Sequence, residues 1–157
     1  MKDKKRIGRW GTLAAAMMLV PVPAAMAQSS DTTRLQWHPP TTLPAGALAA
    51  GFSGDASLPG QATFLLSMPN GYRVGPHVHP GYELIQVRKG TLLIGMGDSS
   101  VTRVLNAGDS VVASAGIPHF WVAKGKTEIS LTFDGPYTIT YLDAADAPKR
   151  KNFPFGY

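Results

Sequence analysis

The sequence of 157 residues contains no cysteine. Without thiols the chain can form no disulfide bond, and it can hold neither a thiolate-bound metal nor an iron–sulfur cluster. Its folded state must therefore be stabilised by its core. Histidine is also scarce, with four in the whole chain, so the position of each one is informative.

Helical periodicity is missing from residues 28–157 as well. This part alternates short apolar or β-branched runs with turns that contain Gly, Pro or Asn, a pattern typical of an all-β barrel or sandwich. Lys89 and Gly90 are expected to form the tight turn of a hairpin. The expected strands are residues 46–53, 62–68, 83–88, 91–96, 101–105, 110–113, 119–123, 127–133 and 137–141.

The first 27 residues predict a secretory signal peptide. A basic start precedes an apolar run at 11–22, and Ala25 and Ala27 give the small-x-small pattern of a cleavage site. The apolar run is shorter than the roughly 18 residues that span a bilayer. We therefore expect cleavage after Ala27, a periplasmic or secreted mature protein, and no stable membrane anchor.

The net charge of +5 belongs mostly to this leader. Removing residues 1–27 takes away five of the 15 basic and one of the 10 acidic residues, which leaves 10 against 9. A mature chain so close to neutral has no electrostatic feature that favours nucleic acid, so we expect no nucleic-acid partner.

Three of the four histidines lie in one segment that is framed by glycine turns. His77 and His79 are two positions apart, so on a strand their side chains project to the same side and can reach one ion. Glu83 follows a Pro-Gly turn and shares its strand face with aliphatic residues, while His119 must arrive from a different strand. Imidazole and carboxylate groups suit Mn, Fe, Co, Ni, Cu or Zn.

This spacing resembles the two-part signature of the cupin family. The resemblance implies a double-stranded β-helix, a jelly-roll-like barrel, over residues 60–142. It also implies one divalent transition metal (Fe, Mn, Ni, Cu or Zn) held by His77, His79, Glu83 and His119, with open positions for water or substrate. Ser114 and Ala123 stand where the family usually has Pro and Asn, and neither is a ligand position.

Cupins with these ligands include dioxygenases, isomerases and lyases, so the resemblance implies a metal-dependent enzyme that acts on a small organic molecule. If the protein is catalytic, dioxygenase-like oxidoreductase chemistry is favoured, although no residue is assigned a catalytic role. A module that binds or senses a small molecule or metal without converting it is the alternative. In a third hypothesis, the metal only holds the barrel together.

Strand parity suggests further residues that could line the pocket. Trp121 shares a face with His119, Arg73 has the parity of His77, and Tyr82 neighbours Glu83. All three are candidates for substrate contact.

The remaining segments flank the barrel. Residues 28–59 are expected to form an N-terminal arm and first strand, and residues 143–157 a C-terminal tail. The Pro-rich part of the arm, 37–44, could lie on the barrel or pair two copies, so a homodimer is expected. His38 lies outside the motif and is expected at the surface.

Overall fold

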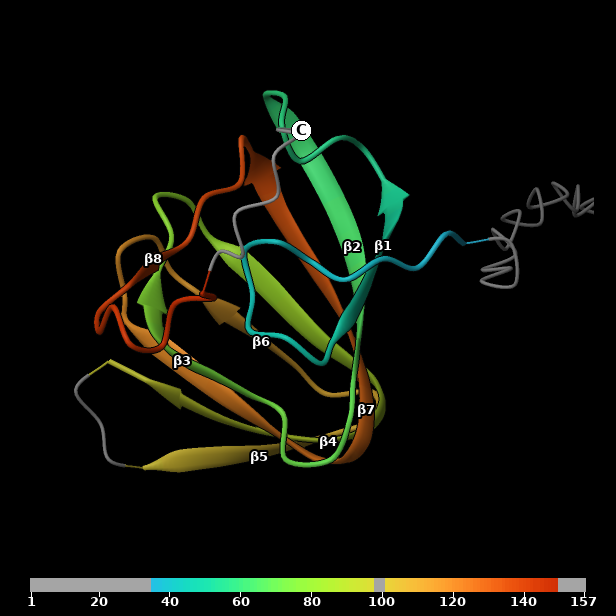
Figure 1. Cartoon of the computed structure of the whole chain (residues 1–157), viewed down its shortest axis with the longest axis vertical. Helices are drawn as coiled ribbons and strands as arrows, with labels where there is room; N and C mark the ends of the chain where they lie inside the picture. The colour runs from blue at the N-terminus through green and yellow to red at the C-terminus, as the bar shows by residue number, and fades with distance from the viewer. Residues whose placement is uncertain (1–34, 98–100, 150–157) are drawn as a thin grey trace, which may run out of the picture. The chain divides into compact units, whose positions relative to one another are not determined.

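The computed structural model describes residues 35–97 and 101–149, which contain eight strands and no helix (Figure 1). The all-β prediction is therefore confirmed for the described residues. The predicted signal peptide and the end of the tail lie outside them. No described helix could cross a membrane. The strands are β1 (Leu48–Ser53), β2 (Gly60–Met68), β3 (Arg73–Val78), β4 (Glu83–Met96), β5 (Thr102–Asn106), β6 (Ser110–Ala113), β7 (His119–Gly135) and β8 (Thr140–Tyr141).

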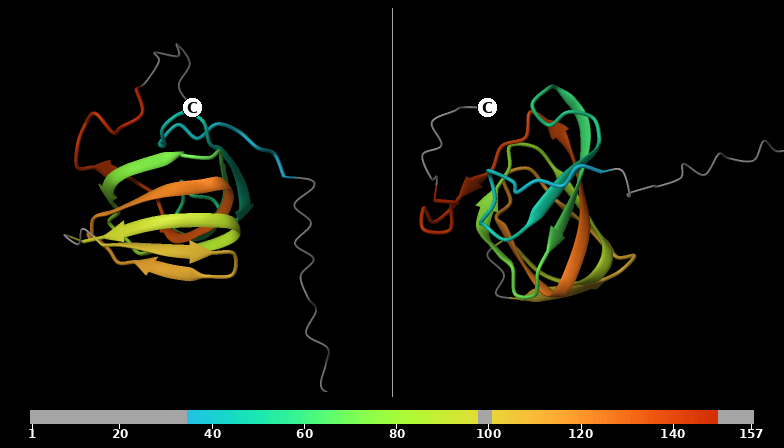
Figure 2. Two further views of the ribbon diagram at one scale, coloured as in Figure 1. Left: turned by 90° about the horizontal axis from the view of Figure 1, so that it is seen from below. Right: turned by 45° about the vertical axis from the view of Figure 1, so that its right-hand side comes forward.

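Two long strands, β4 and β7, organise the barrel. They pair antiparallel along most of their length, and each half of both strands also pairs with a different short neighbour. The first half of β4 pairs with β6 and the second half with β5. The first part of β7 pairs with β3, and the second part pairs with β2. The strands therefore curve around a common interior, which is visible in Figure 2.

The hairpin predicted at Lys89 and Gly90 is wrong. These residues lie inside β4, a continuous strand of 14 residues that shifts register against β7 at this point. Gly90 has a φ of +79°, and a Cβ there would press on the backbone of Lys126 and Thr127. The glycine therefore allows a bulge and a close approach to the partner strand, not a chain reversal. The strands predicted at 119–123 and 127–133 are likewise one strand, β7.

The barrel interior is filled by apolar side chains from strands that face one another. Ile85 and Val87 on β4 are buried, as are Ile129 and Leu131 on β7, and they alternate with more exposed residues as parity predicted. Phe133 is the last residue of this row, and it pairs with Glu83 in the ladder between β4 and β7. Other members of the core are Leu66, Met68, Val74, Leu92, Ile94 and Ala123.

The described part of the arm lies on its own barrel. His38 forms a backbone bridge with Ala49 and has an exposed side chain. Further along, Tyr141 donates a hydrogen bond to the carbonyl oxygen of Thr42 (3.0 Å), and Tyr72 donates one to that of Pro44 (2.6 Å). Of the two arrangements considered for the arm, the structure shows the one in which it lies on the barrel. The homodimer stays a prediction.

Candidate metal centre

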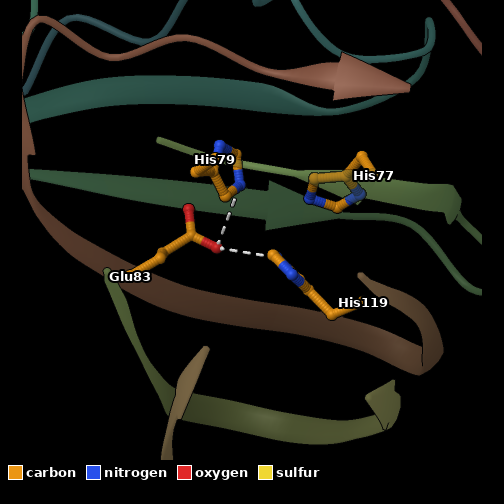
Figure 3. Close-up of side chains that lie close together, drawn as sticks. All are labelled: His77, His79, Glu83 and His119. Carbon is orange, nitrogen blue, oxygen red and sulfur yellow. Dashed lines mark ion pairs between the residues drawn. The ribbon is translucent and has the colours of Figure 1, made fainter. Parts of the chain in front are cut away.

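Four side chains from three strand regions meet in one cluster (Figure 3). His77 lies in β3 and His79 follows just after that strand, while Glu83 begins β4 and His119 begins β7. His77 and His119 are direct partners in the antiparallel ladder between β3 and β7. Backbone pairing therefore brings together histidines that are far apart in the sequence.

The four side chains are buried and close together. Exposure is 0% for His77 and Glu83, 2% for His119 and 5% for His79. Each side chain offers one potential ligand atom, and these four atoms lie within 4.8 Å of one another. The structure thus brings together all four residues that the sequence motif selected.

Hydrogen bonds to the backbone orient the three imidazoles. Nδ1 of His77 lies 2.7 Å from the carbonyl oxygen of Gly75, Nδ1 of His79 lies 2.7 Å from that of Thr138, and Nδ1 of His119 lies 3.1 Å from that of Ile117. A carbonyl oxygen can only accept, so each Nδ1 carries the proton and donates it. Nε2 is then the nitrogen that each ring can offer to a metal, which is the usual arrangement of histidines that bind one.

The atoms that face the centre of the cluster lack hydrogen-bond partners among the described residues. Nε2 of His77, Nε2 of His119 and Oε2 of Glu83 are all buried and unpaired. Burying several lone pairs and a carboxylate oxygen against one another is costly unless a cation sits between them. The donor set therefore fits a divalent transition metal and could hold one.

Burial also sets the protonation states. Burial, together with the nearby His119, lowers the pKa of His77 from 6.5 to about 4, so this ring is neutral near pH 7. Burial alone would raise the pKa of Glu83, but the neighbouring imidazoles, first that of His119, outweigh it and hold this pKa below its usual value. Neutral imidazole and ionised carboxylate are the forms that bind a metal.

The three pocket candidates take different positions. Trp121 is fully buried and packs edge-on against His77, with ring centroids 5.2 Å apart, and its indole N–H has no partner among the described residues. The structure therefore places it in the wall of the site. Tyr82 accepts a hydrogen bond from the amide of Gln61 (3.2 Å) and is not brought to the cluster.

The parity argument for Arg73 is wrong. Val74 pairs with Trp121 and His77 with His119, so β3 has one residue more than β7 between these pairs. This bulge turns Val74, not Arg73, to the same side as His77, and Val74 is fully buried. Arg73 lies at the surface, where it forms an ion pair with Asp146 at 2.9 Å.

Tyr137, a neighbour of the cluster, was missed by the sequence analysis. Its hydroxyl donates a hydrogen bond of 3.0 Å to Oε1 of Glu83 and lies 3.4 Å from Nε2 of His79. It belongs to the loop between β7 and β8, outside the metal-binding motif. Its only signal was an aromatic residue in the last predicted strand, which gave no indication of the partner.

An open groove of about 520 Å³ lies beside the cluster. Its lining includes His79, the most exposed of the four side chains in the cluster, so the groove borders the candidate metal site. Among the residues that the structure describes, no Asp, Glu, Lys or Arg lines it. The lining residues are Val78, His79, Pro80, Ala115, Gly116, Thr138 and Thr140.

The curved all-β barrel and its buried cluster of three histidines and a glutamate define a cupin-type protein. In agreement, residues 64–133 match the family model described as "Cupin domain". Residues 64–133 therefore have the sequence and the fold of a cupin domain.

The known proteins that resemble this chain match only part of it, and in some of them the match spans only a small part of their own length. Oxalate oxidase 1 of Hordeum vulgare is 40% identical over 60 residues, which are 34% of this chain and 30% of the barley protein. The polyketide cyclase RemF of Streptomyces resistomycificus has a similar fold, with a TM-score of 0.60, 13% identity, and coverage of 71% of this chain and 82% of that one. Salicylate 1,2-dioxygenase of Pseudoaminobacter salicylatoxidans gives a TM-score of 0.55 and 19% identity, with coverage of 64% of this chain and 30% of that one.

Proposed function

We propose that this protein is a metal-dependent enzyme that acts on a small organic molecule. The observation that carries the proposal is the set of buried, unpaired ligand atoms on His77, His119 and Glu83. His77, His79, Glu83 and His119 would hold one divalent transition metal. Bound there, such a metal supplies Lewis acidity or a site for dioxygen chemistry.

The chain's own residues would orient and restrict the substrate. The groove beside His79 admits a small molecule, and its lack of charged side chains leaves the hydroxyls of Thr138 and Thr140 as the polar side chains beside the ligand His79. Trp121 closes the wall next to His77 with an apolar surface and one free N–H. A substrate would therefore be held mainly at the metal centre itself, with few specific polar contacts around it.

Among enzymatic reactions we favour oxidative, dioxygenase-like chemistry over isomerase or lyase chemistry. Support comes from the barley relative, which is named an oxalate oxidase, although the shared segment covers less than a third of that protein. The similar polyketide cyclase and salicylate dioxygenase support the fold alone, because their identity to this chain is low.

The test begins with elemental analysis of the purified protein and of a His77→Ala, His79→Ala double variant. We expect near one equivalent of Fe, Mn, Ni, Cu or Zn in the native protein and none in the variant. Oxygen uptake is then followed with a panel of small organic acids and phenols. The enzyme proposal fails if the metal-loaded protein converts no compound under aerobic or anaerobic conditions.

A binding module is the second candidate, and the sparse groove lining favours it. Apart from His79, no acid or base of residues 35–97 or 101–149 lines the groove, so this part of the chain offers few groups for proton transfer there. A ligand that binds saturably to the metal-loaded protein and is recovered unchanged would support this alternative. Measurable turnover of the same ligand would exclude it.

We also propose that residues 1–27 are removed after export and that the mature protein is a homodimer in the periplasm or outside the cell. The basic and apolar pattern of the leader supports export. Mass spectrometry of the native protein, with Gln28 as the expected first residue, and light scattering would test the two parts separately.

A further inference from the structure

Tyr137 is held firmly against the candidate metal site. Its backbone N–H donates a hydrogen bond of 2.8 Å to the carbonyl oxygen of Ala56. Its ring packs between Phe133 and His79, with centroid distances of 4.3 Å and 4.8 Å. These contacts on the backbone and on the ring fix where the hydroxyl points, so its contact with Glu83 is a built feature of the fold.

The two carboxylate oxygens of Glu83 have different surroundings. Oε1 accepts the hydrogen bond from Tyr137 at 3.0 Å. Oε2 has no hydrogen-bond partner in the described part of the chain, and it lies 3.4 Å from Nε2 of His119 and 3.6 Å from Nε2 of His79. Figure 3 shows this oxygen facing the two imidazoles while the other turns away.

The hydroxyl of Tyr137 has one proton and two possible acceptors. Nε2 of His79 is the more distant, at 3.4 Å, and Oε1 of Glu83 is the nearer and carries the charge of a carboxylate. A hydrogen bond to a carboxylate is the stronger of the two, so the proton goes to Glu83. The lone pair of His79 consequently stays free to bind a metal.

We propose that Tyr137 is a positioning residue that makes Glu83 a one-oxygen ligand. By holding Oε1 on its hydroxyl, Tyr137 keeps this oxygen turned away from the three Nε2 atoms, so that Oε2 alone joins them (Figure 3). Without it, the carboxylate can turn and offer both oxygens, which would fill a coordination position that a substrate needs. This inference rests on the proposed metal site, and it assigns a role to a residue outside the metal-binding motif.

The first test uses the protein loaded with Co(II), whose visible absorption weakens as its coordination number rises. Tyr137→Phe keeps the ring contacts with Phe133 and His79 and removes only the hydroxyl. We expect this variant to show a weaker and shifted Co(II) spectrum and to bind Co(II) about 10-fold less tightly, as is usual when a hydrogen bond to a ligand is lost.

Tyr141→Phe is the matched control. The ring of Tyr141 also lies near the cluster, 5.7 Å from that of His77, but its hydroxyl bonds to Thr42 and not to a candidate ligand. We expect its Co(II) spectrum and affinity to equal those of the unaltered protein. A Tyr137→Phe protein that also matches the unaltered protein in both respects overturns the inference.

A second test needs no variant of Tyr137 or of a candidate ligand, because the sequence contains only two glutamates, Glu83 and Glu128. In protein labelled with 13C-glutamate, infrared difference spectra between the Co(II)-loaded and metal-free forms report how Glu83 binds. For Glu83 we expect a wide separation between the frequencies of the two carboxylate stretches, as for one-oxygen binding. The Glu128→Gln variant identifies the signal that comes from Glu128.

The outcomes of these tests distinguish the role proposed for Tyr137 from the proposed metal site. A narrow separation, typical of two-oxygen binding, would overturn the role of Tyr137 while leaving the metal site intact. No Co(II) binding by the unaltered protein would instead overturn the metal site, and the role of Tyr137 with it.

Discussion

His77 and His119 lie directly opposite each other on β3 and β7, with ring centroids 4.2 Å apart. Their Nδ1 atoms are anchored on the carbonyls of Gly75 and Ile117, two residues before each histidine. The two rings are therefore positioned by the strand ladder and by local hydrogen bonds, with their Nε2 atoms left unpaired. Such a site is formed by the fold itself, which has consequences that can be measured.

Glu83→Gln should weaken metal binding strongly. Glutamine keeps the size of the side chain but removes the only negative charge among the four candidate ligands. We expect an affinity loss of about 100-fold or more, since even partners that only support a ligand are worth 10–100-fold. Competition titration with a chelating dye measures it. Glu128→Gln, which alters a glutamate paired with Lys89 at the surface, serves as the control and should bind as the native protein does.

Stability of the metal-free protein should fall as the pH is lowered from 6.5 to 4. The pKa of His77 is lowered to about 4, so the unfolded chain takes up a proton in this window while the folded protein does not. Proton uptake by the unfolded state favours unfolding, by up to about 3 kcal/mol at the acid end. Glu83, whose pKa is also lowered, acts in the same direction at still lower pH.

Urea unfolding of metal-free protein at several pH values tests this dependence. His77→Asn should show a shallower loss of stability on acidification, whereas His38→Asn, at an exposed position, should follow the native curve. A native protein equally stable at pH 6.5 and pH 4 would contradict the buried, neutral state of His77.

Removing the metal should lower the melting temperature without unfolding the barrel. A ligand present at 100 times its dissociation constant adds about 2.7 kcal/mol to the free energy of unfolding. The apolar core formed by β4 and β7 does not depend on the metal-binding side chains, so it should persist. Thermal melts with and without a chelator measure the shift. Complete unfolding on chelation would instead support the hypothesis that the metal holds the barrel together.

Trp121 should report metal binding through its fluorescence. Its ring lies 5.2 Å from that of His77 and 5.9 Å from that of His119, so a bound Cu(II) ion would quench its emission. Titration of the native protein should show saturable quenching that Trp121→Phe loses and Trp37→Phe, altered in the arm, retains. Equal quenching in both variants would place the ion elsewhere.

The candidate ligands could be found from the sequence because the signal is local. His77 and His79 sit two positions apart, and Glu83 heads a strand whose alternation marks the buried face, as the structure confirms. For Arg73 the same parity argument failed, because a bulge between Val74 and His77 shifts the alternation. Gly75 and Pro76 did mark a possible bulge, since both residues interrupt regular strand pairing, but the parity argument took no account of them.

The sequence by itself determined the all-β class, the four residues of the cluster and the absence of thiolate ligands, since these follow from alternation, spacing and composition. Only the tertiary structure decided that β4 runs through Gly90, because pairing with β7 on both sides of the bulge holds the strand together. It also decided that Tyr137 reaches Glu83. That contact joins residues 54 positions apart, and such a pairing depends on how distant strands pack rather than on any local pattern.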